Sequence, residues 1–167
     1  MPVTYKKIAS VTVASPQAAI DFTSIPATYD DLILFISGRS TRSSAADYGL
    51  ISLNGSSSSF TGRQLSGNGA TAASNTGARE TGSYPAATAT SNTFGNGMIY
   101  FPNYAGSTNK SFSVDNVSED NATTAYQVLG AQLWSNTAAI TSISLTLGNG
   151  PNWAANSTAT LYGIKKS

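Results

Sequence analysis

Apolar and polar residues alternate along most of this chain, and the alternation predicts β-strands. The clearest segment is 143–147, in which Ile, Leu and Leu are separated by Ser and Thr. Segments 112–117 and 126–134 alternate in the same way, and Asn116 falls on the apolar face of the first. Successive side chains of a strand point to opposite faces, so each segment presents one apolar face. Gly130 is predicted to mark a bulge or bend in its strand.

The first third of the chain predicts four further strands, two of which form a hairpin. Segments 5–13 and 19–22 are expected to pair with each other around a turn at Ser-Pro. Segment 32–36 is apolar at every position, which is typical of a central strand covered on both faces. Segment 48–53 is expected to end at Asn54-Gly55, a dipeptide that readily adopts positive φ.

Two more segments, 97–101 and 157–164, complete a prediction of about nine strands and no helix. Many short strands separated by turns favour two packed antiparallel sheets. We therefore expect an all-β antiparallel β-sandwich, with a jelly-roll-like topology preferred over an immunoglobulin-like one. The 167 residues are enough for one substantial core, so residues 1–167 are assigned to a single domain.

One long stretch lacks this alternation and is predicted to be a loop or arm. It covers residues 54–93, and in its portion 66–93, 24 of 28 residues are Gly, Ala, Ser, Thr or Asn. Such a segment has few large apolar side chains with which to offset the entropy lost on ordering. Loops of this length in a compact domain are often functional, so we expect this one to be ordered by a neighbouring protein.

The charge content of the chain is low and argues for an assembled protein. Charged residues make up 10% of the sequence and the formal net charge is +1. Nucleic acid is not an expected partner because basic residues pair only at 6–7 and 165–166. The longest apolar run, 32–36, is far shorter than the ~20 residues of a membrane-spanning helix, so no membrane is expected. A nearly uncharged exterior suits close packing with other proteins.

Catalytic and metal-binding chemistry is poorly represented. The chain has no His and no Cys, which removes the usual general bases, nucleophiles and zinc ligands. We therefore expect no enzymatic activity and no cofactor. Asp30 and Asp31 precede a strand and are interpreted as turn-capping residues. Segment 115–120, with Asp115 and Asp120, has enough oxygen ligands for calcium, although an acidic turn explains the same pattern and no metal site is assigned.

Four aromatic residues raise the alternative of sugar binding, because aromatic rings stack on the apolar faces of sugars. Trp134 ends a strand and is expected to pack in or beside the core. Tyr84, Tyr104 and Trp153 are predicted in loops and are candidates for a contact surface. The full set of candidate protein-contact residues is Arg63, Arg79, Tyr84, Tyr104 and Trp153.

The two ends of the chain resemble small virion proteins of tailed bacteriophages, cyanophages especially. The resemblance lies in residues 4–13 (TYKKIASVTV), 20–32 (IDFTSIPATYDDL) and 157–164 (STATLYGI), and extends to 34–39 and 139–147. It leaves the middle segment unmatched. The family includes capsid-decorating and tail-fibre-like proteins, and the resemblance implies a β-sandwich that assembles, often as a trimer, on the outer surface of a phage particle.

Within that family the sequence favours a capsid decoration, or cement, protein. The chain starts directly with a strand and contains neither heptads nor repeats, unlike a tail fibre with its stem. The expected partners are the major capsid protein or other virion proteins, together with further copies of this chain. The alternative is a tail-fibre, receptor-binding or carbohydrate-binding module of the virion.

Overall fold

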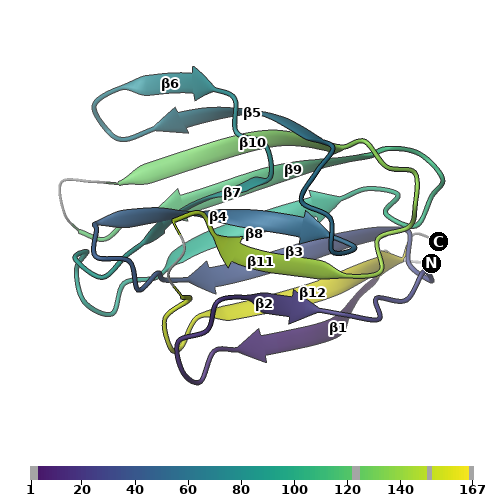
Figure 1. Ribbon diagram of the computed structural model, residues 1–167, viewed down its shortest axis with the longest axis horizontal. Helices are drawn as coiled ribbons and strands as arrows, with labels where there is room; N and C mark the ends of the chain where they lie inside the picture. The colour runs from purple at the N-terminus through teal and green to yellow at the C-terminus, as the bar shows by residue number, and fades with distance from the viewer. Residues whose placement is uncertain (1–3, 122–124, 150–151, 166–167) are drawn as a thin grey trace.

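The computed structural model describes residues 4–121, 125–149 and 152–165, and within these ranges the chain forms twelve strands and no helix. All strand pairs are antiparallel and build two sheets, which confirms the predicted all-β sandwich (Figure 1). The large sheet has the order β1 (Thr4–Thr12), β12 (Thr158–Lys165), β3 (Asp31–Gly38), β8 (Gly95–Phe101), β9 (Lys110–Ser118), β10 (Tyr126–Trp134), β5 (Phe60–Gly67) and β6 (Ala72–Asn75). The small sheet has the order β2 (Ile20–Phe22), β11 (Ile143–Leu147), β4 (Ala46–Leu53) and β7 (Glu80–Pro85).

The core lies between the two sheets, where the inward residues of each strand meet. Alternation is complete in β9 and β11, whose inward positions are all buried. Aromatic rings pack against one another within this layer. Phe60 stacks on Trp134 with ring centroids 6.1 Å apart, and Phe101 lies 4.9 Å from Phe112. Trp134 is buried, which confirms its expected place in the core.

The first two strands do not form the predicted hairpin. β1 pairs with β12, in a register that sets Thr4 opposite Lys165, whereas β2 pairs with β11 in the other sheet. The chain changes sheets at Val13, which is buried and exchanges backbone hydrogen bonds with Asn156 and Ser157. The hairpin prediction is wrong because alternation identifies a strand but carries no information on its partner.

The predicted long loop contains three strands, so the prediction of a structureless arm over 54–93 is wrong. β5 pairs with β10 along its whole length, from Phe60 opposite Trp134 to Gly67 opposite Gln127. β6 adds to the outer side of β5, and β7 joins the small sheet beside β4. Small polar residues are accommodated here because backbone ladders and neighbouring strands supply the stabilisation that their own side chains lack.

Two buried amide side chains connect β7 to the large sheet. Asn116 on β9 accepts a hydrogen bond from the Ser83 backbone N–H at 2.7 Å and donates to the Asn96 carbonyl at 2.8 Å. Gln132 on β10 accepts from the Arg79 backbone N–H at 3.0 Å and donates to the Gly77 carbonyl at 2.6 Å. These bonds satisfy backbone groups of the β7 region that have no ladder partner on that side.

A buried lysine closes the end of β9. Lys110 is 1% exposed, and its ammonium group donates to the backbone carbonyls of Gly106 at 2.6 Å, Thr108, and Thr137 at 3.3 Å. Three donors therefore meet three acceptors, which offsets the cost of burying the charge. Burial lowers the pKa of Lys110.

Local predictions at turns and strands have mixed outcomes. β4 ends at Leu53 and is followed by the expected turn at Asn54 and Gly55, which have φ of 51° and 73°. Gly130 marks no bulge, because β10 keeps an unbroken register with both neighbours. A side chain at Gly130 would instead meet Val114 at 3.1 Å, so close packing explains the glycine. Asp31 accepts from the Asn103 backbone N–H at 3.0 Å and so caps the turn that follows β8.

Candidate functional site

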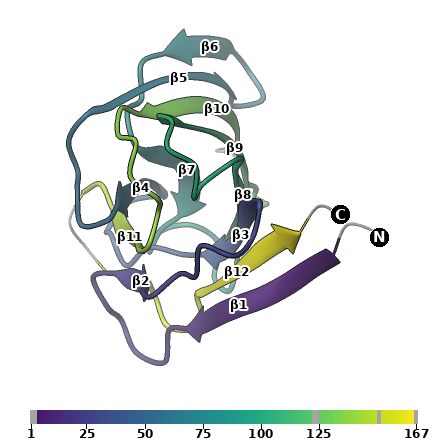
Figure 2. The same cartoon turned by 90° about the vertical axis from the view of Figure 1, so that its right-hand side faces the viewer.

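The outer face of the large sheet is the broadest exposed surface that the strands create. The small sheet covers only the opposite face (Figure 2). Segment 32–36 was expected to be covered on both sides, but Phe35 on β3 is 42% exposed on this outer face. That expectation is wrong for Phe35, since no second layer lies over it.

Four large apolar side chains form a straight row across this face. Register places Phe35 opposite Met98, Met98 opposite Asp115, Asp115 opposite Leu129, and Leu129 opposite Leu65. Directly opposed residues of antiparallel strands point to the same face, so all five side chains point outward. We call Phe35, Met98, Leu129 and Leu65 the apolar row. It crosses the four strand spacings from β3 to β5, or about 19 Å.

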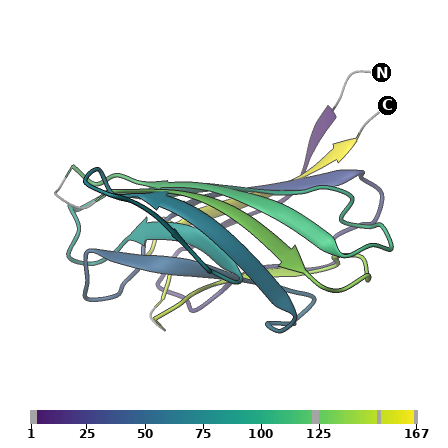
Figure 3. The same ribbon diagram turned by 90° about the horizontal axis from the view of Figure 1, so that it is seen from above.

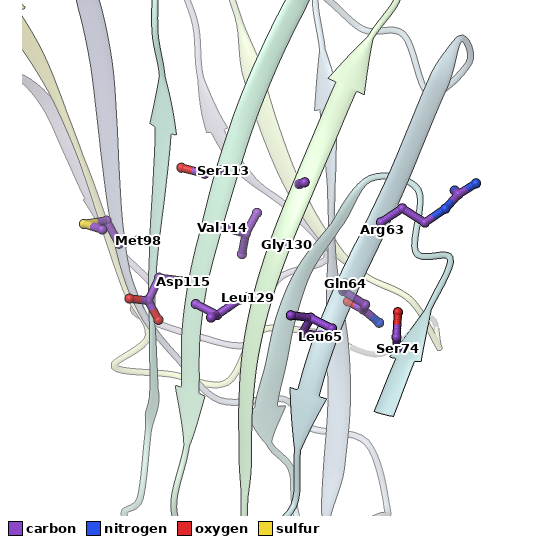
Figure 4. Close-up of a pocket in the computed structure, with 11 residues that line it drawn as sticks. Arg63, Gln64, Leu65, Ser74, Met98, Ser113, Val114, Asp115, Leu129 and Gly130 are labelled. Carbon is purple, nitrogen blue, oxygen red and sulfur yellow. The ribbon is translucent and has the colours of Figure 1, made fainter. Parts of the chain in front are cut away.

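The apolar row is exposed to solvent to an extent that requires explanation. Phe35, Met98, Leu129 and Leu65 are 42%, 36%, 49% and 60% exposed. Single exposed apolar residues are ordinary, whereas four of them aligned on one face and interrupted only by Asp115 make this face a candidate interaction surface. Figure 4 shows Met98, Asp115, Leu129, Leu65 and Ser74 following one another across the strands.

The surroundings of the apolar row are almost neutral. Register places two flanking rows beside it on the outer face: Ile33, Tyr100, Ser113, Ala131 and Arg63 on one side, and Ser37, Asn96, Val117, Gln127 and Gly67 on the other. The charged residues of these three rows are Asp115, within the apolar row, and Arg63, in a flanking row, and their charges are opposite. Tyr100 donates to Asp31 at 2.6 Å, which holds its ring against the sheet.

The relief of the face is shallow. A hollow of about 520 Å³ lies between Met98, Leu129 and Leu65, and further hollows adjoin it on either side along the same row. A small-molecule site is normally a deep cleft that encloses its ligand. An open, flat, neutral and partly apolar face is instead suited to contact with another protein.

Three of the predicted contact residues are buried and do not form a contact surface. Tyr84, Tyr104 and Trp153 are each 0% exposed. The Tyr84 ring packs edge-on against Trp153 at 5.1 Å, and Trp153 Nε1 donates to the Leu145 carbonyl at 3.0 Å. The Tyr104 hydroxyl donates to the backbone carbonyl of Pro26. Burial raises the pKa of both tyrosines.

The two predicted arginines have different positions. Arg63 on β5 is exposed on the outer face beside the apolar row, and its guanidinium donates to the Gly62 carbonyl at 2.8 Å. Arg79 precedes β7 with φ of 66° and donates to the Ser52 hydroxyl at 3.2 Å. Of the five candidates, Arg63 alone lies at the proposed contact face, and its role there stays a prediction.

The acidic segment 115–120 is divided by the strand that contains most of it. β9 continues to Ser118, so the side chains of Asp115 and Asn116 point to opposite faces. Glu119 accepts the backbone N–H of Asn121 at 2.7 Å. Among residues 4–121, 125–149 and 152–165, acidic side chains do not gather in a group of three or more able to hold a metal.

The apolar row is absent from the sequence-based predictions, although the sequence contains a signal for it. Val128 and Leu129 are consecutive apolar residues in a strand, so one of them has to face away from the core. The continuous run 32–36 requires the same of Phe35. Such breaks in alternation indicate apolar side chains on the outward face of a strand.

Comparison with known proteins identifies no relative of this chain. No family model matches the chain, and no curated protein or solved structure matches it. The described part of the chain also contains no helix long and apolar enough to cross a bilayer. The case for a function therefore rests on the outer face of the large sheet and on the resemblance of the chain ends.

Proposed function

We propose that this protein is a non-catalytic structural component of a tailed-phage particle. It decorates the outside of the capsid and binds the major capsid shell through the outer face of its large sheet. The observation that carries the proposal is the apolar row on a nearly neutral face. The virion setting comes from the resemblance of residues 4–13, 20–32 and 157–164 to small phage structural proteins.

The dimensions of the face are sufficient for a stable protein interface. Eight strands span seven spacings of about 4.8 Å, and about seven residues per strand at about 3.3 Å add a second dimension, giving about 800 Å². A specific interface buries about 800 Å² on each partner. The whole face of one copy therefore meets the requirement without contribution from other surfaces.

The apolar row provides the main favourable energy of such a contact. Complete burial of one Leu, Met or Phe side chain is worth about 1.5–3 kcal/mol. The four side chains are already about half covered by the sheet, so each adds about 1 kcal/mol on docking. Copies joined in one oligomer engage the shell together, so that weak single contacts reinforce one another through effective concentration.

The first test is the location and copy number of the protein on purified phage particles, by electron microscopy and quantitative protein analysis. The proposal expects density on the outer capsid surface and hundreds of copies per particle. A handful of copies at the tail would favour the alternative tail-fibre or receptor-binding role. Absence from the particle would refute both.

The second test asks whether the apolar row makes the contact. The double variant Leu65→Thr, Leu129→Thr keeps strand propensity and removes two apolar side chains. We expect it to fold normally and to rebind protein-depleted particles at least about tenfold more weakly, given the ~2 kcal/mol removed. Tyr48→Thr removes a ring that is 39% exposed on the outward side of the small sheet, away from the docking face, and is the matched control. Equal rebinding by the double variant and the control would refute this docking face.

A further inference from the structure

The two sheets have four outer strands, and three of them are protected against pairing with another chain. Edge strands expose unpaired backbone N–H and C=O groups, which proteins shield with charges, bulges, prolines or covering contacts. β1 carries Lys6 and Lys7 and a register shift after Lys7. β2 is three residues long with Asp21 exposed. β7 ends in Pro85, and the side chains of Asn116 and Gln132 cover its free side.

The fourth edge, β6, has none of these devices except its shortness. Its residues are Ala72, Ala73, Ser74 and Asn75, all exposed, uncharged and in regular register with β5. Figure 1 shows the β5–β6 hairpin at the border of the large sheet opposite β1. In the described part of the chain, β6 pairs with no strand other than β5.

The hairpin geometry shows which backbone groups of β6 point away from β5. The Asn68 backbone N–H donates to the Thr71 carbonyl at 3.2 Å, so residues 68 and 71 form a hydrogen-bonded pair. Hydrogen-bonded and non-bonded pairs alternate along an antiparallel ladder. Ala73 therefore bonds to β5, whereas the N–H and C=O of Ala72 and Ser74 point to the open edge.

We propose that β6 is a strand-addition site for a second copy of this chain. A two-fold axis at Ala73 places Ala72 opposite Ser74 of the second copy, and each such pair exchanges both its N–H and its C=O bonds. The arrangement forms four new hydrogen bonds, and the same surface serves both copies, as a two-fold interface requires. Eight strands from each copy then form one continuous sheet.

This pairing has a consequence for the outer face. The two-fold axis of an antiparallel pair is perpendicular to the sheet, so both apolar rows lie on the same side of the joined sheet. The dimer inference rests on the edge alone and does not require the proposed capsid role. Where both hold, two docking faces in one plane would engage a capsid together and strengthen attachment through effective concentration.

Single-cysteine cross-linking tests the pairing directly, because the natural chain has no Cys. Across the proposed axis, Ala73 faces Ala73 of the second copy as a non-hydrogen-bonded pair, with Cα atoms about 4.5 Å apart. That spacing lies within the disulfide range. We expect Ala73→Cys to oxidise to a disulfide dimer that reductant reverses.

Two control variants separate this contact from other associations. Ser57→Cys lies in an exposed loop and reports random collision, and Ser113→Cys lies on the outer face and reports packing of one face on another. We expect both to cross-link at least about tenfold more slowly than Ala73→Cys. The proposal would be overturned if Ala73→Cys and Ser57→Cys cross-linked at equal rates. It would also be overturned if Ser113→Cys cross-linked faster than the other two variants.

Sedimentation of the cysteine-free protein provides a second measurement. Ser74→Pro removes an edge N–H that β5 does not use, and proline is tolerated at such edge positions. We expect a dimer in the unmodified protein, weakened at least about tenfold by Ser74→Pro and retained by Ser74→Thr, with circular dichroism unchanged in both variants. A strict monomer would overturn the proposal, as would a trimer indifferent to Ser74→Pro.

Discussion

Substitution of Asn116 tests how the two sheets are held together, because the side-chain amide of this residue links them. It is fully buried, it accepts from the Ser83 N–H at 2.7 Å, and it donates to the Asn96 carbonyl at 2.8 Å. Gly82, with φ of 99°, lets the β7 backbone approach so closely that an added Cβ would lie 2.2 Å from Asn116 Cγ. This one side chain therefore connects β7, β8 and β9.

The perturbation is Asn116→Leu, which keeps the branched shape and the number of heavy atoms of the side chain and removes both hydrogen bonds. Each buried backbone group left without a partner costs about 1–3 kcal/mol. Ser83 is only half-buried and Asn96 is exposed, so water recovers part of this cost and we expect a total loss of about 2–4 kcal/mol. Against a typical domain stability of about 5–15 kcal/mol, that loss is large.

Urea unfolding, followed by the fluorescence of buried Trp134 and Trp153, measures this loss. The matched control is Gln127→Leu, the same kind of change on the exposed outer face, for which we expect less than about 0.5 kcal/mol. A loss below about 1 kcal/mol for Asn116→Leu, with the control unchanged, would refute the bridging role.

A second variant separates hydrogen bonding from packing. Asn116→Asp retains an acceptor for Ser83, but a carboxylate cannot donate to Asn96 and is costly to bury. Burial raises the pKa of such a carboxyl, so the protonated form, which can donate, is favoured in the folded state. The stability deficit relative to the natural protein should therefore be smallest and constant below the unfolded pKa of about 4, and should grow as the pH rises above it. A deficit independent of pH would indicate packing alone.

Three further predictions follow from the interior. Gly82→Ala should lower the free energy of unfolding by more than about 2 kcal/mol in thermal or urea unfolding, because of its positive φ and its contact with Asn116, whereas Gly67→Ala, with open space around it, should be nearly neutral. Lys110→Met should cost about 1.5–3 kcal/mol in urea unfolding, since three carbonyls lose a charged donor, and an unchanged midpoint would contradict that role. Burial raises the pKa of Tyr84 above its unfolded value of about 10. The stability that the protonated Tyr84 contributes is therefore intact below pH 10. Above pH 10 the free energy of unfolding falls by up to ~1.4 kcal/mol per pH unit. Tyr84→Phe should flatten that alkaline decline, and an unchanged slope would count against it.

Residue patterns predicted the strands better than their arrangement. Segments 143–147 and 112–117 are strands in the structure because alternation reflects burial of one face, a property of the segment itself. The partner of β1 is more than 140 residues away in sequence, and alternation holds no record of it. β5, β6 and β7 were missed because most of their residues are small or polar, and their order comes from neighbours such as β10 and β4.

The candidate site could be predicted only in part, for a related reason. Tyr84 and Trp153 were predicted to be exposed because each lies in a turn-rich segment of the sequence. Both are buried, because β7 and the segment around Trp153 pack beneath the large sheet. The outward positions of Phe35 and Leu129 were readable from consecutive apolar residues. Their alignment with Met98 and Leu65 depends on cross-strand register, which only the folded chain reveals.

The pairing of the first strand with the last has a practical consequence. Thr4 lies opposite Lys165, and Figure 3 shows the start of β1 and the end of β12 at one corner of the molecule. A short linker between them, with a new opening in the exposed segment 57–59, would give a circular permutant that keeps every strand pair. The most distant contact of the natural chain would become a hairpin, and because local contacts form with less loop-closure entropy, the permutant should fold faster. The same corner would also carry a displayed peptide well clear of the β5–β6 border.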